Sequence, residues 1–189
     1  MMIEAHARRH RFSVADIERM LKAGLLHDAR LELIDGELLE MNAQGPTHAG
    51  LTTLIREHVR SVYGSDFHVR DHSPLATSDH DLPEPDIAVV RGSVSRYMVA
   101  YPRGTDAVLV IEIAATTLRH DRAKARVYAR GGVQEYWIVD IEGRRLEVHR
   151  KPDANGDYAV RLLLDEHESV SWPDRDGAVD VRALLPPAG

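Results

Sequence analysis

Two short stretches decide the fold of this chain: Pro85-Asp86-Ile87-Ala88-Val89-Val90 and Ala107-Val108-Leu109-Val110-Ile111-Glu112-Ile113-Ala114. Both are rich in β-branched residues and are bounded by Pro, Gly or Asp, which is typical of buried strands. Asp86 opens the first apolar run and Glu112 closes the second. A carboxylate beside buried strands costs free energy unless it has a partner or a cation. We therefore expect two neighbouring strands that present two acids to one point, with a basic residue nearby.

The candidate basic residue is Lys124, which lies in a segment of helical character. Residues 118–130 place apolar side chains at positions 123, 127 and 128, and Gly131-Gly132 ends the predicted helix. A strand is predicted directly afterwards, at 135–140. Lysine is scarce among the 24 Lys and Arg residues of the chain. A lysine beside the acidic pair therefore indicates a place that needs a compact ammonium group rather than a planar guanidinium.

Length and composition indicate an ordinary globular protein. We expect a flexible N-terminal arm at 1–11 and a single domain at 12–189, because 189 residues are enough for one core. Cysteine is absent, which excludes disulfides and thiolate metal sites. We find no signal peptide and no apolar run of about 18 residues, so we expect a cytoplasmic protein that makes no membrane contact.

The net charge of −6 argues against a generally basic surface for nucleic acid. A local cluster could still supply positive charge. The predicted helix at 118–130 carries four arginines, namely Arg119, Arg122, Arg126 and Arg130. These arginines form either a basic patch or a solvated helix face, and the sequence leaves both interpretations open.

The remaining segments predict a mixed architecture of helices and strands. Helices are expected at 14–26, after Ser13 as N-cap, and at 47–63. Asp35-Gly36 predicts a β-hairpin with strands at 31–34 and 37–41. Residues 92–106 are assigned only as a connection. Further short strands are expected at 67–70, 75–77, 145–150, 158–164, 169–172 and 178–184.

The two acids and the lysine suit a site that cleaves phosphodiesters. Asp86 and Glu112 could hold Mg²⁺, which prefers hard oxygen ligands and retains several waters. The metal would lower the pKa of a bound water and neutralise charge on the phosphate. Lys124 could orient the attacking water or bind the phosphate as a point charge. The spacing alone is a weak signal, because many unrelated acids are 26 residues apart, and it also fits structural ion pairs or acids at strand ends.

Several motifs follow one another in a specific order over about residues 12–150. They are Glu32-Leu33-Ile34-Asp35-Gly36-Glu37, His48 at a helix start, Pro85-Asp86-Ile87-Ala88-Val89-Val90, Val110-Ile111-Glu112-Ile113-Ala114, Asp121 with Lys124 and Tyr128, and Gly132-Val133-Gln134-Glu135-Tyr136-Trp137-Ile138-Val139-Asp140. In these motifs the chain resembles the Uma2 family of endonucleases, a branch of the PD-(D/E)XK nuclease superfamily. The resemblance implies an α/β (α+β) restriction-endonuclease-like fold, with a mixed central β-sheet flanked by helices. The extra strands after Asp140 would be antiparallel.

The resemblance also implies a function. It suggests a Mg²⁺-dependent endonuclease that hydrolyses DNA, with Mn²⁺ able to substitute, and with Asp86 and Glu112 as metal ligands. The superfamily's lysine normally stands two residues after the second acid, where this chain has Ala114. The resemblance places it instead on the following helix, at Lys124, as the third catalytic residue. Enzymes of this kind often pair two sites to cut two strands, so a homodimer is expected.

Three further residues could support the site. His48 could hold a phosphate at a helix N-terminus or be a partly exposed cap. Glu37 could supply a third acid or be a solvated strand residue. Asp121 matches the family motif, although its step to Lys124 is one residue shorter than usual. Glu32 and Glu40 alternate with leucines, which predicts an outward face for both.

A fold alone does not confer an activity. The alternative function is therefore a non-catalytic nucleic-acid-binding or protein-interaction module on a nuclease-like scaffold. Divalent-metal binding distinguishes the two hypotheses, because a ligand that binds only the native state raises the melting temperature.

Overall fold

The computed structural model describes residues 9–26, 30–41 and 43–187, so most of the expected N-terminal arm lies outside the described residues. Its centre is a six-stranded sheet in the order β3-β4-β5-β6-β7-β8. The pairing of β5 with β6 is parallel and all other pairings in this sheet are antiparallel, which makes it a mixed sheet. The strands are β3 (Phe67–Asp71), β4 (Ile87–Arg91), β5 (Ala107–Ala114), β6 (Glu135–Asp140), β7 (Arg145–Pro152) and β8 (Tyr158–Asp165).

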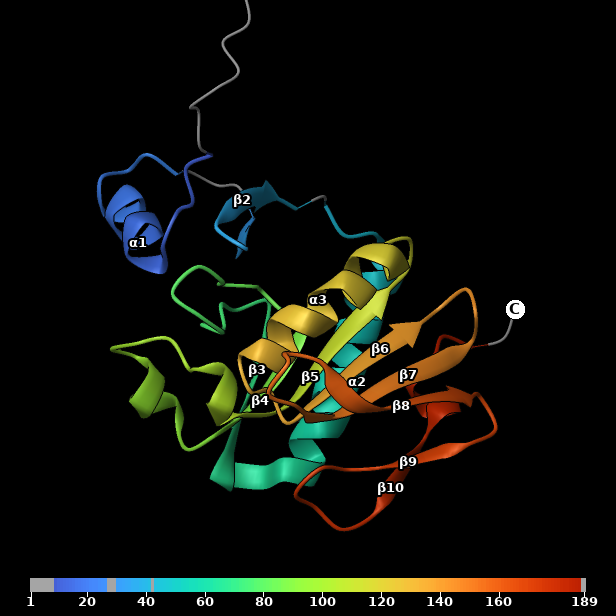
Figure 1. Cartoon of the computed structure of the whole chain (residues 1–189). Helices are drawn as coiled ribbons and strands as arrows, with labels where there is room; N and C mark the ends of the chain where they lie inside the picture. Colours follow the sequence, from blue (N-terminus) through green and yellow to red (C-terminus); the bar gives the residue numbers. More distant parts are fainter. Residues whose placement is uncertain (1–8, 27–29, 42, 188–189) are drawn as a thin grey trace, which may run out of the picture.

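Two helices cover opposite faces of this sheet (Figure 1). Helix α2 (Pro46–Tyr63) buries Leu51, Ile55 and Val59 against one face. Helix α3 (Leu118–Arg130) packs Ala125, Tyr128 and Ala129 against the other. Helix α3 is also the connection between the parallel strands β5 and β6, because parallel neighbours need a crossover. Within the described residues, no helix has the length and apolar content required to cross a bilayer.

Alternation along β5 decides which side chains meet which helix. Successive side chains of a strand point to opposite faces. Leu109, Ile111 and Ile113 join the core under α2, whereas Val110 and Ala114 join the core under α3. Glu112 therefore faces α3. Because β5 extends to Ala114, Glu112 lies inside the strand rather than at the end of it as the apolar run suggested.

A small unit stands beside the sheet and contains α1 (Val14–Lys22), β1 (Leu31–Ile34) and β2 (Glu37–Glu40). The Asp35-Gly36 turn has φ values of 49° and 77°, the conformation that this pair favours in two-residue hairpins. Leu33 and Leu82 exchange backbone hydrogen bonds of 3.3 and 2.7 Å, which fix the hairpin to the segment before β4. Helix α1 ends earlier than the predicted 14–26, because Gly24 adopts a positive φ of 67°.

Other expectations need correction in detail. Residues 75–77 form no strand, and Ala76 makes only an isolated bridge to Arg103. The connection at 92–106 contains two 3-10 helices, η2 (Val94–Tyr97) and η3 (Gly104–Asp106). The C-terminal strands are antiparallel as expected, but β9 (Ser169–Ser171) and β10 (Ala178–Asp180) form a separate two-stranded sheet. The strand predicted at 178–184 is shorter than expected: it ends at Asp180, and η4 (Val181–Leu184) follows.

A close backbone contact joins η3 to the end of α3. A Cβ atom on Gly104 would lie 2.4 Å from the carbonyl oxygen of Gly131, which side-chain rotation cannot relieve. We expect Gly104→Ala to lower the free energy of unfolding by about 1–3 kcal/mol. A Cβ atom on Gly50, on the exposed side of α2, would have no atom within 4 Å. We expect Gly50→Ala to raise the free energy of unfolding by about 0.5–1 kcal/mol. Urea denaturation measures both, and equal effects would contradict this contact.

Candidate functional site

A cavity of about 550 Å³ opens where β4 begins, β5 ends and α3 starts. These points coincide because β4 and β5 are antiparallel neighbours, with Ile87 opposite Ile111. The loop before α2 closes another side of the cavity. The polar side chains in the lining are Arg30, Glu40, Gln44, His48, Glu84, Asp86, Glu112, Thr116, Thr117, Arg119, His120 and Asp121.

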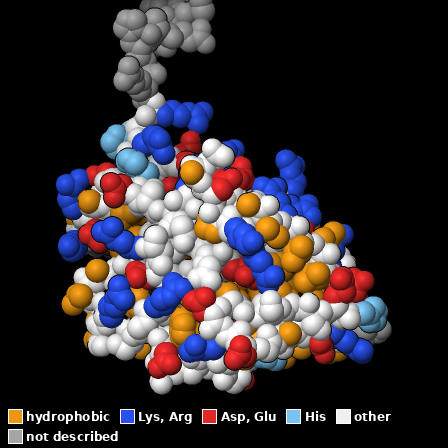
Figure 2. Space-filling model, turned by 60° about the horizontal axis from the view of Figure 1, so that its bottom comes forward, with side chains coloured by type: hydrophobic (Ala, Val, Ile, Leu, Met, Phe, Trp, Pro, Cys, Tyr) orange, Lys and Arg blue, Asp and Glu red, His pale blue; other side chains and the backbone are white. Residues whose placement is uncertain are grey.

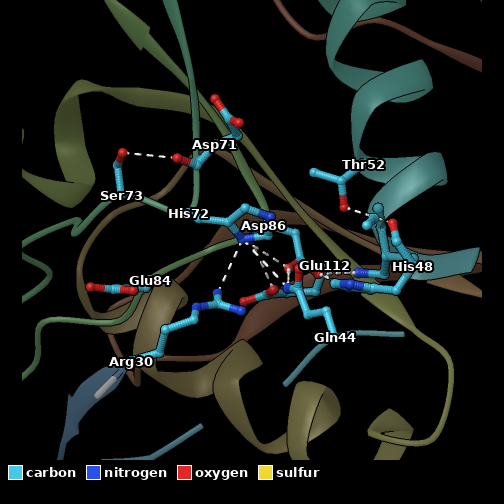
Figure 3. Close-up of polar contacts among 12 residues, drawn as sticks. Arg30, Gln44, His48, Thr52, Asp71, His72, Ser73, Glu84, Asp86 and Glu112 are labelled. Carbon is cyan, nitrogen blue, oxygen red and sulfur yellow. Dashed lines mark hydrogen bonds and ion pairs between the residues drawn. The ribbon is translucent and has the colours of Figure 1, made fainter. Parts of the chain in front are cut away.

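Asp86 is the most densely contacted acid in this cavity (Figure 3). The backbone N–H of Ile113 donates to its Oδ2 atom at 2.8 Å, and His48 Nε2 lies 2.9 Å from the same oxygen. Gln44 Nε2 donates to Oδ1 at 3.0 Å, with His72 Nδ1 at 3.5 Å. The chain positions the ring of His72 through a left-handed residue, with φ of 42° directly after β3. Asp86 is thus contacted from three segments: the start of α2 with the loop before it, the residue after β3, and β5.

Glu112 lies against Asp86, and the predicted pairing of the two acids is therefore present. Glu112 Oε2 accepts a hydrogen bond of 3.2 Å from the backbone N–H of Asp86. Both carboxyl groups are buried, with 6% of Asp86 and 3% of Glu112 exposed. Burial, reinforced by the negative charge of Glu112, raises the pKa of Asp86 to about 8. The protein therefore holds two buried acids side by side at the wall of the cavity.

Lys124 is buried between two acids, with 3% of its surface exposed. Its Nζ atom lies 2.5 Å from Glu112 Oε1 and 2.9 Å from Glu32 Oε1. Tyr128, one turn further along α3, donates to the same Glu112 oxygen at 2.7 Å. Lys124 is not among the described residues that line the cavity, so it stands behind Glu112 rather than beside a bound ligand. The i, i+4 spacing of Lys124 and Tyr128 places both on one helix face.

The two partners of Lys124 keep it charged. Burial alone would lower the pKa of Lys124, but Glu112 and Glu32 outweigh it and hold that pKa above its usual range. Burial alone would raise the pKa of Glu32, but His120 and Lys124 bring it down to about 2. The prediction of an outward-facing Glu32 is wrong, because Glu32 is only 1% exposed. The alternation of Glu32 with leucines shows only that its side chain lies on the other face of the hairpin from theirs, and that face packs against Lys124.

Two of the three supporting candidates are at the cavity and one is not. His48 is buried at the start of α2, where its hydrogen bond to Asp86 occupies Nε2. Asp121 lines the cavity and accepts a 2.6 Å hydrogen bond from Thr117; burial and Glu112 raise its pKa to about 6. Glu37, by contrast, is exposed and pairs with Arg9 at 3.1 Å, outside the cavity lining.

Sequence reasoning missed Gln44, His72, Arg30 and the role of Glu32. Gln44 and Arg30 stand in loops with no motif around them, and Arg30 Nη2 lies 3.1 Å from His72 Nδ1. His72 follows β3 in a polar loop like several other histidines. Only Glu32 carried a usable signal, because it opens the motif shared with the Uma2 family.

The residues present are compatible with a divalent cation. No group of three or more His, Asp or Glu side chains in the described part of the chain is arranged to hold a metal ion. Two carboxylates are nevertheless enough for Mg²⁺, which retains waters and takes further oxygens from substrate phosphates. Burial and Glu112 raise the pKa of Asp86, and a cation bound beside it would act in the opposite direction by stabilising the ionised form. Asp86 and Glu112 would be its protein ligands.

Comparison with known proteins shows the family and the fold of the chain. The model of the Uma2 family, described as "Putative restriction endonuclease", matches residues 14–175. The chain belongs to the Uma2 family. A crystal structure of "a putative nuclease belonging to DUF820" from Anabaena variabilis is 14% identical, with a TM-score of 0.72 over 92% of this chain and 97% of that one. This likeness shows the fold, and no curated protein matches the chain. Family and fold together support a nuclease-like function for this Uma2 chain.

The raised pKa of Asp86 predicts a pH-dependent stability for the metal-free protein. The pKa is about 8 in the folded state against 3.8 as the ordinary value. The contribution of Asp86 to the free energy of unfolding is therefore fully present below about pH 4. It declines as the pH rises above about 4 and is lost once the pH passes about 8. In EDTA, we expect Asp86→Asn to melt several degrees above wild type at about pH 8, with the gap closing toward about pH 4. Exposed Asp176→Asn is the control, and a pH-independent gap for Asp86→Asn would contradict the assignment.

The buried ion pairs of Lys124 predict a large stability effect. Lys124→Met leaves Glu32 and Glu112 without their ammonium partner and should lower the free energy of unfolding by about 3–5 kcal/mol. Adding Glu32→Gln should recover part of this loss, because it removes one of the two orphaned charges. Lys22→Met on exposed α1 is the matched control. Urea denaturation measures these variants, wild type and Glu32→Gln alone, and strictly additive losses in the double variant would rule out the coupling.

Proposed function

We propose that this Uma2 protein is a divalent-metal-dependent endonuclease that hydrolyses phosphodiester bonds in DNA. The observation that carries the proposal is the meeting of two buried carboxylates, Asp86 and Glu112, at the wall of an open cavity. Mg²⁺ is the expected ion, with Mn²⁺ able to substitute, because the ligands are hard oxygens. A cation bound there would supply Lewis-acid chemistry, neutralising charge on the phosphate and lowering the pKa of a water.

The surrounding residues would keep the two acids in place. The Ile113 N–H, His48 and Gln44 restrict Asp86. On the far side, Lys124 and Tyr128 hold one oxygen of Glu112 and leave its Oε2 atom close to Asp86. Lys124 thus acts as a positioning residue in this proposal, because Glu112 stands between it and the cavity. Fixing both carboxylates before substrate arrives reduces the reorganisation needed during the reaction.

Asp121 is the candidate general base. It lines the same cavity, and its pKa of about 6 lies near neutrality, where a carboxylate can accept a proton from water and release it again. The hydrogen bond from Thr117 fixes its Oδ2 atom. Attack of the activated water on phosphorus forms one P–O bond and breaks another, and the leaving oxygen takes a proton. Pairing of two such sites in a homodimer would allow both strands to be cut.

Metal binding is the first test. We expect Mg²⁺ or Mn²⁺ to raise the melting temperature of wild type relative to EDTA, and Glu112→Gln to abolish this rise. Glu37→Gln removes the same charge from an exposed strand outside the cavity and should respond like wild type. The molar mass of the protein in solution is a separate test of the homodimer, for which we expect twice the mass of one chain.

Cleavage of supercoiled plasmid is the second test. Asp86→Asn and Glu112→Gln should each reduce the rate by at least about 100-fold while still folding. Asp121→Asn should reduce the rate and flatten its dependence on pH between about 5 and 7. A wild-type protein that neither responds to metal nor cleaves DNA would favour the alternative, a non-catalytic nucleic-acid-binding or protein-interaction module.

A further inference from the structure

A second cavity, of about 540 Å³, lies between α3 and the strands β7 and β8. It is separate from the candidate catalytic cavity, although α3 contributes to both. Residues 119–121 of α3 line the first cavity, whereas Arg122 and Arg126 line the second. The two cavities have no lining residue in common. We call the second one the α3–β7–β8 cleft.

The cleft has an excess of positive charge in an otherwise acidic chain. Four arginines line it, Arg122, Arg126, Arg145 and Arg161, against the two acids Glu147 and Asp157. Asp140, outside the lining, pairs with Arg145 at 2.8 Å, so the excess is one positive charge. The chain as a whole has a net charge of −6, and basic and acidic side chains are interspersed over the face seen in Figure 2. The cleft therefore differs in sign from the net charge of the whole chain.

The ion pairs in the cleft leave positive charge available. Arg126 and Arg161 share the single carboxylate of Asp157, at 3.8 and 2.9 Å. The side chains of these two arginines are 65% and 61% exposed, so both can reach a ligand. Arg122 makes a bidentate contact with Glu147, with Nε 3.0 Å from each carboxylate oxygen. Arg122 is therefore neutralised and Arg126 and Arg161 are only half neutralised.

The lining of the cleft also contains a buried histidine without a hydrogen bond. His149 is 6% exposed, and within the described residues neither of its ring nitrogens has a hydrogen-bond partner. Its ring packs against Tyr136 and Tyr158, with centroids 5.6 and 5.8 Å away. Burial and the charge of Arg161 lower its pKa, which keeps the imidazole neutral, with one donor and one acceptor nitrogen. Buried polar groups are seldom left unpaired, so ordered water or a ligand group that reaches the ring from the cleft would satisfy this histidine.

We propose that the α3–β7–β8 cleft binds a phosphate group of the nucleic-acid strand on which the candidate active site acts. This inference rests on the proposed function. Arginine suits phosphate because its planar fork donates two parallel hydrogen bonds, and the donor nitrogen of His149 can add a third. Arg126 lies five residues after Asp121, which is about 7.5 Å along the helix axis at 1.5 Å per residue. This distance along the helix axis is comparable to the length of a few nucleotides of one strand, at about 3.4 Å each.

The test measures binding of a short fluorescent DNA oligonucleotide in EDTA, where no cleavage occurs, over a range of salt concentrations. Arg126→Gln/Arg161→Gln should bind at least about tenfold more weakly, with a salt slope smaller by about 1–2, because phosphate contacts release counterions. Neither substitution leaves a buried acid unpaired, since Asp157 is partly exposed. The control is Arg60→Gln/Arg182→Gln, which removes the same charge from α2 and η4, on the opposite face of the sheet.

A third variant tests the histidine separately. His149→Phe keeps an aromatic ring between Tyr136 and Tyr158 but removes both nitrogens. We expect weaker oligonucleotide binding with an unchanged salt slope, because a neutral imidazole displaces no counterion. A salt slope that falls as in the arginine variant would contradict a neutral hydrogen-bonding role.

Inorganic phosphate distinguishes a strand from a free phosphomonoester. Melting in phosphate is compared with melting in chloride at equal ionic strength. If the arginine variant loses only a phosphate-dependent stabilisation and binds DNA normally, the cleft takes free phosphate and the strand assignment is overturned. If the variant matches its control in both measurements, the cleft is no phosphate site. The arginine variant keeps Asp86 and Glu112, so its metal response remains a separate test of the proposed nuclease.

Discussion

The ammonium group of Lys124, buried between Glu32 and Glu112, is the contact on which the site depends. It joins three elements that are distant in sequence, since Glu32 comes from β1, Glu112 from β5 and Lys124 from α3. An unpaired charge at this depth would cost several kcal/mol, so none of the three side chains can leave without affecting the others. The same contact fixes the hairpin to the sheet and one oxygen of Glu112 toward the helix.

This buried pairing makes the two acids of the site unequal. Glu112 has a positive partner and a tyrosine donor behind it. Asp86 is surrounded by a backbone N–H, an amide and two histidines whose pKa values burial lowers. Glu112 thus already has a positive partner in Lys124, whereas burial and the charge of Glu112 raise the pKa of Asp86 and disfavour its ionised form. That asymmetry is the electrostatic reason for expecting a cation on the cavity side rather than between the helix and the sheet.

Helix α3 contributes residues to both proposed sites, the candidate catalytic cavity and the α3–β7–β8 cleft. Its inward face supplies Lys124 and Tyr128, its first turn supplies Asp121, and its outer side supplies Arg122 and Arg126. A single helix can do this because its residues point in all directions around the axis, with a repeat of 3.6 residues. An acidic protein can in this way hold a strongly anionic substrate through one local group of arginines, without a basic surface overall.

The sequence by itself determined the strands at 87–90 and 107–111, the helix at 118–130 and the hairpin at Asp35-Gly36. These follow from local rules, because β-branched runs, glycine stops and turn residues act over a few positions. Only the tertiary structure decided that Glu32 is buried against Lys124, that Gln44 and His72 contact Asp86, and that Glu37 lies outside the cavity. Such contacts join residues tens of positions apart, and no local pattern records which loops the packing of α2 and α3 will bring to one end of the sheet.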